Sequence, residues 1–313
     1  MSANDRVHSI WVAGMSRREA LRLSLLAGAG VAGVVVLGCG GGEKESVTPT
    51  IAPTAVPPSG FFDSNGVKIH YETFGEGKPL VLVHGLYGSI QEDWVKTGIV
   101  SGIGSGRQLI ALDHRGHGES DKPKNLEDYR VEKMGQDVVN LMDYLGVQKA
   151  DLLGYSMGAF ISNWVLINHQ DRLNSVILSG TGGNLKANDP ATARSLYDAL
   201  MAEDPTTVTD PIGKLVRDAF DQAGVDRNTR EALAACTLQF LPLEQHYEAS
   251  DFVNVKIPVM IINGEQDTVT GGVEELVAAI PGVKFVTVPG GDHLSVRSLP
   301  AYQQEVLAFL KQR

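Results

Sequence analysis

Short apolar runs, separated by amphipathic stretches, follow one another from residue 61 to the end of the chain. Six of these runs are rich in Val, Ile and Leu, which is typical of strands that are buried on both faces. They cover residues 79–83, 108–112, 150–153, 175–178, 259–262 and 284–288. Ahead of them, Asn65-Gly66 lies between apolar residues 61–62 and the alternating segment 67–71, a pattern that predicts a β-hairpin.

Stretches with helical periodicity alternate with these runs. The apolar residues of segment 131–145 that recur on one helical face are Met134, Val138, Leu141, Met142 and Leu145. Helices are also expected over residues 157–169, 273–280 and 300–311. Because strands that alternate with helices are joined by right-handed crossovers, the sequence predicts an α/β fold. Its sheet is expected to be mostly parallel, with helices on both faces.

The alternation is interrupted between about residue 184 and residue 250. This region contains no run typical of a strand, but it has amphipathic helical segments at 191–202, 211–223 and 228–240. A helical insertion between two core strands predicts a cap over one end of the sheet.

The first 38 residues have the pattern of an export signal. Arg17-Arg18 precede an uncharged stretch that ends at Cys39, and a short apolar run after positive residues is typical of bacterial export. The segment resembles a twin-arginine signal, but Ala20 departs from that pattern and leaves the export route open. The end of the run resembles a lipoprotein cleavage site, which implies lipidation of Cys39. An uncleaved membrane anchor is the alternative.

Residues 39–60 are predicted to be the lipidated cysteine and a tether. The segment is rich in Gly, Thr and Pro and has no amphipathic period, so it is expected to be extended and semi-rigid. The folded domain is then expected over 61–313, outside the cytoplasm and held to a bacterial membrane through the lipid alone.

The composition limits the classes of partner that the folded part is expected to bind. The formal net charge is −10 at pH 7, which argues against nucleic acid or an anionic membrane surface as a partner. The apolar fraction of 43% suffices for a core without metal or disulfide support. Cys236 lies in an apolar setting and is predicted to be a buried, unreactive thiol.

One motif indicates a catalytic serine, the segment Gly154-Tyr155-Ser156-Met157-Gly158. It follows a predicted strand and opens a predicted helix, the context in which a G-x-S-x-G match places a serine on a tight, exposed turn. The flanking glycines leave room for strand and helix to approach each other. Ser156 is therefore a candidate nucleophile.

Three further motifs stand at the ends of predicted strands. They are His84-Gly85-Leu86-Tyr87-Gly88, Gly264-Glu265-Gln266-Asp267 and Gly290-Gly291-Asp292-His293, and the turn 113–120 follows another strand. Together with the serine motif, these residues resemble the α/β-hydrolase superfamily in its serine-nucleophile, esterase-like branch. The resemblance runs from about residue 61 to the C-terminus and implies an eight-stranded sheet with a helical cap.

The resemblance also implies the role of each site residue. Ser156 is expected to be the nucleophile, His293 its base and Asp267 the residue that orients the base, in the chain order of this fold. The backbone N–H groups of Met157 and Leu86 are expected to bind the oxyanion. The chain has no nucleotide loop, metal-ligand cluster or redox motif, so no cofactor or metal is expected.

Other histidines and carboxylates offer alternatives. Asp292 adjoins His293, but neighbouring side chains usually diverge, and Glu265 fits only if the loop register shifts. The remaining histidines of the folded part are interpreted as structural. His84 shapes its loop, and His114 and His117 are expected to be hydrogen-bonded within their turn. The other three, His70, His169 and His246, lack an adjacent partner in the loop of residues 264–267. Asp113 is likewise interpreted as structural.

Several functions remain open at this level. The preferred one is hydrolysis of a carboxylic ester with a small or medium apolar acyl group. Hydrolysis of a carbon–carbon bond in a diketone-like substrate and cofactor-free perhydrolysis use the same residues. A lipid-tethered ligand-binding protein is the non-enzymatic alternative. Substrate identity, oligomeric state and the membrane leaflet stay open.

Overall fold

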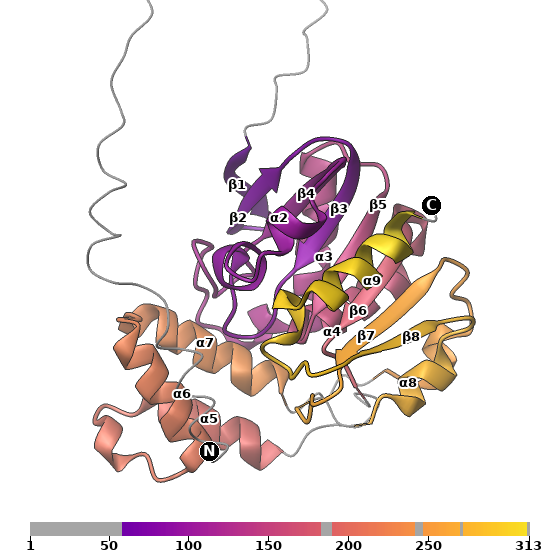
Figure 1. The fold of residues 1–313 in the computed structure, drawn as a ribbon. Coiled ribbons are helices and arrows are strands. Elements are labelled where there is room, and N and C mark those ends of the chain that lie inside the picture. The colour runs from indigo at the N-terminus through magenta and orange to yellow at the C-terminus, as the bar shows by residue number, and fades with distance from the viewer. Residues whose placement is uncertain (1–57, 183–189, 242–246, 270–271, 312–313) are drawn as a thin grey trace, which may run out of the picture. The chain divides into compact units, whose positions relative to one another are not determined.

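The computed structural model describes residues 58–182, 190–241, 247–269 and 272–311 (Figure 1). The predicted signal of residues 1–38, Cys39, most of the tether and His246 lie outside the described residues. Among the helices that the structure does describe, none is both long and apolar enough to cross a membrane.

One sheet of eight strands forms the centre of the fold. In space the strands follow the order β1-β2-β4-β3-β5-β6-β7-β8. β2 runs antiparallel to both of its neighbours, β1 and β4. From β4 to the far edge at β8, all neighbouring strands are parallel. This confirms the predicted α/β class. The strands are β1 (Ser59–Ser64), β2 (Val67–Phe74), β3 (Lys78–Val83), β4 (Arg107–Leu112), β5 (Ala150–Tyr155), β6 (Leu173–Ser179), β7 (Val259–Gly264) and β8 (Lys284–Val288).

Helices cover both faces of the sheet, as Figure 1 shows. One apolar core lies between the sheet and α3 (Val131–Tyr144), α4 (Met157–Asn168) and α8 (Glu274–Ala279). A second core lies between the opposite face and α2 (Ile99–Ile103) and α9 (Pro300–Lys311). Because both faces are covered, β3 and β5 are almost entirely apolar, and this is why their runs were recognisable in the sequence.

Three helices form the insertion between β6 and β7. They are α5 (Pro190–Met201), α6 (Pro211–Gln222) and α7 (Arg227–Phe240), grouped beside one end of the sheet in Figure 1. Asp210 and Asp226 cap α6 and α7 by accepting backbone N–H groups of the first turn. The helices share a small apolar cluster of Leu200, Phe220, Leu233 and Ala234. We refer to these three helices as the cap.

Short segments differ from the sequence prediction. β1 begins at Ser59, inside the predicted tether of residues 39–60, because Ser59 and Gly60 pair with Glu72 and Tyr71 of β2. The predicted pattern also gave no helix between residues 84 and 107, where the structure has η1 (Gln91–Val95) and α2. The other short helical turns are η2 (Leu126–Tyr129), η3 (Gln170–Arg172), η4 (Pro205–Thr207), η5 (Ala249–Phe252) and η6 (Val296–Ser298).

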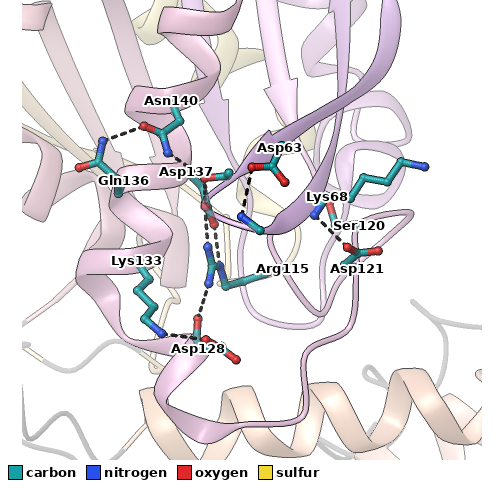
Figure 2. Close-up of polar contacts among 12 residues, drawn as sticks. Asp63, Lys68, Arg115, Ser120, Asp121, Asp128, Lys133, Gln136, Asp137 and Asn140 are labelled. Atoms are coloured by element: carbon teal, nitrogen blue, oxygen red, sulfur yellow. Dashed lines mark hydrogen bonds and ion pairs between the residues drawn. The ribbon is translucent and has the colours of Figure 1, made fainter.

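A buried ion pair fixes the turn that follows β4. Figure 2 shows Arg115 directed at Asp137 of α3 and at the main-chain oxygen of Asp128. The two contacts between the Arg115 guanidinium and the Asp137 carboxylate measure 2.8 and 2.7 Å. Asp137 also accepts the hydroxyl of Ser64 on β1. Both charges are almost fully buried, so removing one partner would leave the other uncompensated. The pair therefore joins this turn to α3 and β1.

Candidate active site

Ser156 lies on the sharp turn between β5 and α4. Its backbone has φ 54° and ψ −120°, a conformation that non-glycine residues rarely adopt. The neighbouring glycines explain how the turn is packed. A Cβ atom at Gly158 would lie 1.9 Å from the carbonyl oxygen of Val83, and one at Gly154 would lie 2.3 Å from that of Gly158. Only glycine allows β5, β3 and α4 to meet so closely.

The structure brings Ser156, His293 and Asp267 together at the carboxyl ends of β5, β8 and β7. The Nε2 atom of His293 lies 3.0 Å from Ser156 Oγ, and its Nδ1 atom lies 2.8 Å from Asp267 Oδ2. A carboxylate can only accept, so we place the imidazole proton on Nδ1 and leave Nε2 as the acceptor that faces the serine. The Asp267 side chain is only 1% exposed, and that of His293 is 11% exposed.

The loop after β3 lies against the serine turn. A Cβ atom at Gly85 would be 3.2 Å from Ser156 Cβ, so this backbone passes directly beside Ser156. Tyr87 has φ 64°, which bends the loop back over the sheet edge. Within the described part of the chain, the N–H groups of Leu86 and Met157 donate to no protein acceptor.

The cap contacts both of these segments through α7. The hydroxyl of Thr237 donates to the carbonyl of Leu233, so the hydroxyl of Tyr87, 2.8 Å away, donates to Thr237. The Tyr87 ring also packs edge-on against Phe220 of α6. Cys236 is buried, with its Sγ 3.9 Å from the Sδ of Met157, and burial raises the pKa of its thiol.

The alternative carboxylates, Asp292 and Glu265, accept backbone N–H groups of nearby loops. Asp292 accepts the N–H groups of Leu294 and Ser295, and Glu265 accepts the N–H of Gly290. Both therefore shape the segment that carries His293. Asp113, interpreted from the sequence as structural, accepts the N–H groups of Ile90 and Glu119.

The other histidines of the region differ in part from the prediction. His84 donates from Nδ1 to the Gly85 carbonyl and accepts the N–H of His114 at Nε2, and His117 Nδ1 lies 3.0 Å from the Arg115 carbonyl. The His114 ring was expected to be hydrogen-bonded, but neither of its nitrogens has a partner among the described residues. Burial lowers the pKa of both His114 and His117, so both rings are neutral. His70, in contrast, pairs with Asp113 at 2.9 Å.

Sequence reasoning missed a buried pair beneath the site, Asp93 and Arg297. Asp93 Oδ1 lies 2.9 Å from Arg297 Nη1, and Asp93 Oδ2 accepts the N–H of Gly85 at 2.8 Å. Arg297 follows His293 by four residues, and its guanidinium lies 3.4 Å from the centre of the Tyr155 ring. No local pattern marks the pair, because its members lie 204 residues apart.

Comparison with known proteins identifies the family. A family model for the alpha/beta hydrolase fold matches residues 78–296, more than half of the chain. The chain belongs to the α/β-hydrolase family.

Named relatives of this α/β-hydrolase are distant. The 3-oxoadipate enol-lactonase 2 of Acinetobacter baylyi is 26% identical over 220 residues, which cover 65% of this chain and 78% of the relative. The soluble epoxide hydrolase of a Corynebacterium species is 28% identical over 251 residues, which cover 77% of this chain and 83% of the relative. A hydrolase from Pseudomonas aeruginosa has a similar fold, with a TM-score of 0.67 and 23% identity over 80% of this chain and 98% of that one. The family and these relatives support hydrolysis as the class of reaction.

Among the residues that the structure describes, no group of three or more His, Cys, Asp and Glu side chains is arranged to hold a metal ion.

Proposed function

We propose that this α/β-hydrolase is a serine hydrolase that cleaves a carboxylic ester through an acyl-enzyme. The observation that carries the proposal is the line of contacts from Ser156 Oγ to His293 Nε2 and from His293 Nδ1 to Asp267, at 3.0 and 2.8 Å. Nucleophile, base and orienting carboxylate within hydrogen-bond distance are the arrangement that activates a serine hydroxyl.

In the acylation step, Ser156 Oγ attacks the ester carbonyl carbon while its proton passes to His293 Nε2. The Asp267 carboxylate stabilises the imidazolium that forms and keeps the ring oriented. The negative charge that develops on the carbonyl oxygen is bound by the N–H groups of Met157 and Leu86. When the tetrahedral intermediate collapses, the carbon–oxygen bond to the alcohol breaks and His293 returns the proton to that alcohol.

Deacylation repeats the steps with water. His293 takes a proton from water as its oxygen attacks the acyl carbon, and then returns the proton to Ser156 Oγ as that oxygen leaves. The carboxylic acid is released and the enzyme is regenerated. The same imidazole thus serves as base and acid in each half of the reaction.

Two observations bear on the substrate. The loop of residues 84–88, which we call the oxyanion loop, packs its Tyr87 side chain against the apolar cluster of the cap, and this apolar character favours a small or medium apolar acyl group. One relative is an enol-lactonase, which favours a lactone, a cyclic ester, as the second candidate. The epoxide-hydrolase branch of the fold uses an aspartate nucleophile, and here that position is Ser156.

The test combines a fluorophosphonate probe with a panel of p-nitrophenyl esters and lactones of increasing chain length. Parent protein, Ser156→Ala and Ser101→Ala are compared, because Ser101 is an exposed serine on α2 that serves as a matched control. We expect labelling and turnover to vanish together in Ser156→Ala and to persist in Ser101→Ala.

Other results would redirect the assignment. Labelling without turnover would move the search to carbon–carbon bond cleavage or perhydrolysis, which use the same nucleophile. A folded parent protein that neither labels nor turns over any substrate would favour a ligand-binding protein.

A further inference from the structure

Three segments of the candidate active site converge on one buried ion pair. Asp93 lies in η1, shortly after the loop that carries Leu86, and Arg297 lies in η6, shortly after His293. Asp93 is 7% exposed and Arg297 is 4% exposed. Besides the contact between the charged groups, Arg297 Nη1 donates to the main-chain oxygen of Asp93 at 3.1 Å. The pair therefore joins the oxyanion loop to the loop of residues 290–293 that carries His293, which we call the histidine loop.

Tyr155 connects the third segment. It precedes Ser156, and its hydroxyl donates to the main-chain oxygen of His293 at 2.5 Å. The Arg297 guanidinium lies over its ring, in the geometry of a cation–π contact. The nucleophile turn is thus held against both the ion pair and the backbone of the histidine loop.

Asp93 contacts the oxyanion loop directly. Its Oδ2 atom accepts the N–H of Gly85, and a Cβ atom at Gly88 would lie only 2.5 Å from the same oxygen. The peptide that contains the Gly85 N–H immediately precedes the Gly85–Leu86 peptide, whose N–H is directed at the oxyanion in the proposed mechanism. Fixing the first peptide limits the rotation of the second.

The negative charge of the Asp93 carboxylate is neutralised by Arg297. Burial opposes ionisation of Asp93, but the neighbouring Arg297 guanidinium holds the pKa of Asp93 below its ordinary value. A carboxylate beside the oxyanion loop would repel the charge that develops on the substrate oxygen. Arg297 neutralises that carboxylate while leaving one of its oxygens free to accept the Gly85 N–H.

We propose that Asp93 and Arg297 are positioning residues that set the Leu86 N–H for oxyanion binding. The inference rests on the proposed function, and neither residue touches the substrate. Arg297 orients and neutralises the carboxylate, and the carboxylate fixes the loop. Because the oxyanion forms only in the transition state, the loss of this positioning lowers kcat and leaves KM little changed.

Two double variants separate positioning from charge. Asp93→Asn with Arg297→Gln keeps an amide oxygen that can accept the Gly85 N–H, whereas Asp93→Ala with Arg297→Gln removes the acceptor. Neither leaves a buried charge unpaired. We expect the first to retain most of the parent kcat. The second is expected to lose about tenfold to a hundredfold in kcat, since displaced catalytic groups cost rates of this order.

Arg107→Gln with Asp151→Asn is the matched control. Arg107 forms a buried pair with Asp151 at 2.8 Å, but these residues lie at the amino ends of β4 and β5, away from the site. This variant is expected to lose stability and keep the parent kcat. Equal kcat values in the two folded double variants would overturn the proposal, as would a selective effect on KM.

The rate of fluorophosphonate labelling at Ser156 is measured in the same variants, because the oxyanion loop also binds the phosphonyl oxygen. A parent that labels but turns over no ester contradicts the ester assignment alone, and the labelling rates then decide the positioning proposal by the same comparison. A folded parent that does not label at all overturns both.

Discussion

The backbone of Ser156 is held in a conformation that costs about 1–3 kcal/mol for a residue with a side chain. The contacts around it maintain this conformation. The Ser156 N–H donates to Ser179 of the next strand, and its carbonyl accepts the N–H of Ala159 in α4. A serine on such a turn projects its hydroxyl above the sheet edge, where the carboxyl ends of the parallel strands also place Asp267 and His293.

At this scale, replacing Asp267 tests the orienting role. The amide of Asp267→Asn can present an N–H to His293 Nδ1, which favours the wrong tautomer and leaves Nε2 unable to accept the serine proton. We expect kcat for ester hydrolysis to fall by about 10⁴-fold. Ser156→Ala is expected to lose more, about 10⁶-fold.

Asp292→Asn is the control, because the Asp292 carboxylate accepts N–H groups of its own loop. Its kcat is expected to stay near that of the parent. If Asp267→Asn were as active as the parent, the assignment of Asp267 would be wrong.

The individual residues of the site differ in how far the sequence could predict them. Ser156, Asp267 and His293 each lie in a local motif that follows a strand, so each could be placed at the same sheet edge. Asp93 and Arg297 could not be found in this way, because their relationship exists only in three dimensions. The partner of His70 was missed for the same reason, since Asp113 approaches it across paired strands.

At the scale of elements, the cap helix α7 is coupled to the oxyanion loop. Tyr87 donates to Thr237, and its ring contacts Phe220 of α6, so this one side chain of the loop touches two helices of the cap. A displacement of α7 would therefore be transmitted to the residue next to Leu86.

A double-mutant cycle measures this coupling. Tyr87→Phe and Thr237→Val each remove one partner of the hydrogen bond, and each is expected to lower the free energy of unfolding by about 1 kcal/mol. Because the two hydroxyls contact each other, the double variant is expected to lose clearly less than the sum of the single variants. The free energies come from urea unfolding, and strict additivity would show that the two residues are not coupled.

The elements themselves were predicted unevenly from the sequence. The core strands were recognisable because both of their faces are covered, which requires continuous apolar runs. Helices α3, α4 and α9 are long enough to show a period. The η1 and α2 segments are too short for periodicity, and α2 contains Gly102, whose Cα lies against Gln303 of α9. α2 is thus packed closely against α9, a tertiary contact that no local pattern reveals.

At the scale of the whole molecule, we propose that the domain is exported and anchored through Cys39. This inference rests on the sequence of residues 1–39 alone. We expect the full chain to fractionate with membranes and to incorporate labelled fatty acid, whereas Cys39→Ser incorporates none. Cys236→Ser is the control and is expected to behave as the parent, because its buried thiol is remote from that segment in the sequence. Labelling that persists in Cys39→Ser would contradict the anchor.

Acid stability is the other property of the whole domain, and it follows from two buried imidazoles, His114 and His117, whose rings lie close to that of His84. Burial, together with neighbouring positive charge, lowers the pKa of His117 to about 3 and that of His114 well below its ordinary value. Both rings gain a proton on unfolding at mildly acidic pH. The unfolded state then binds more protons than the folded state, so stability falls as the pH decreases below about 6.5.

Asp113 and His70 are expected to contribute little to the change in stability between pH 5.5 and pH 4. Burial opposes ionisation of Asp113, but its hydrogen bond with His70 holds the pKa at about 2, so its contribution is lost mainly below this window. Burial also lowers the pKa of His70, but its contacts with Asp113 outweigh that effect and the net pKa is raised. The stability it contributes is fully present below its unfolded pKa and is lost only as the pH rises.

We therefore expect the free energy of unfolding to decrease from pH 5.5 to pH 4, by up to about 1.4 kcal/mol per pH unit for each proton taken up. In His117→Asn this slope is expected to be smaller, because one of the protonating rings is absent, while the Asn amide can still donate to the Arg115 carbonyl. Ser101→Ala removes no titratable group and is expected to keep the parent slope. Urea unfolding at each pH gives the slopes, and identical slopes for His117→Asn and the parent would show that His117 does not control acid stability.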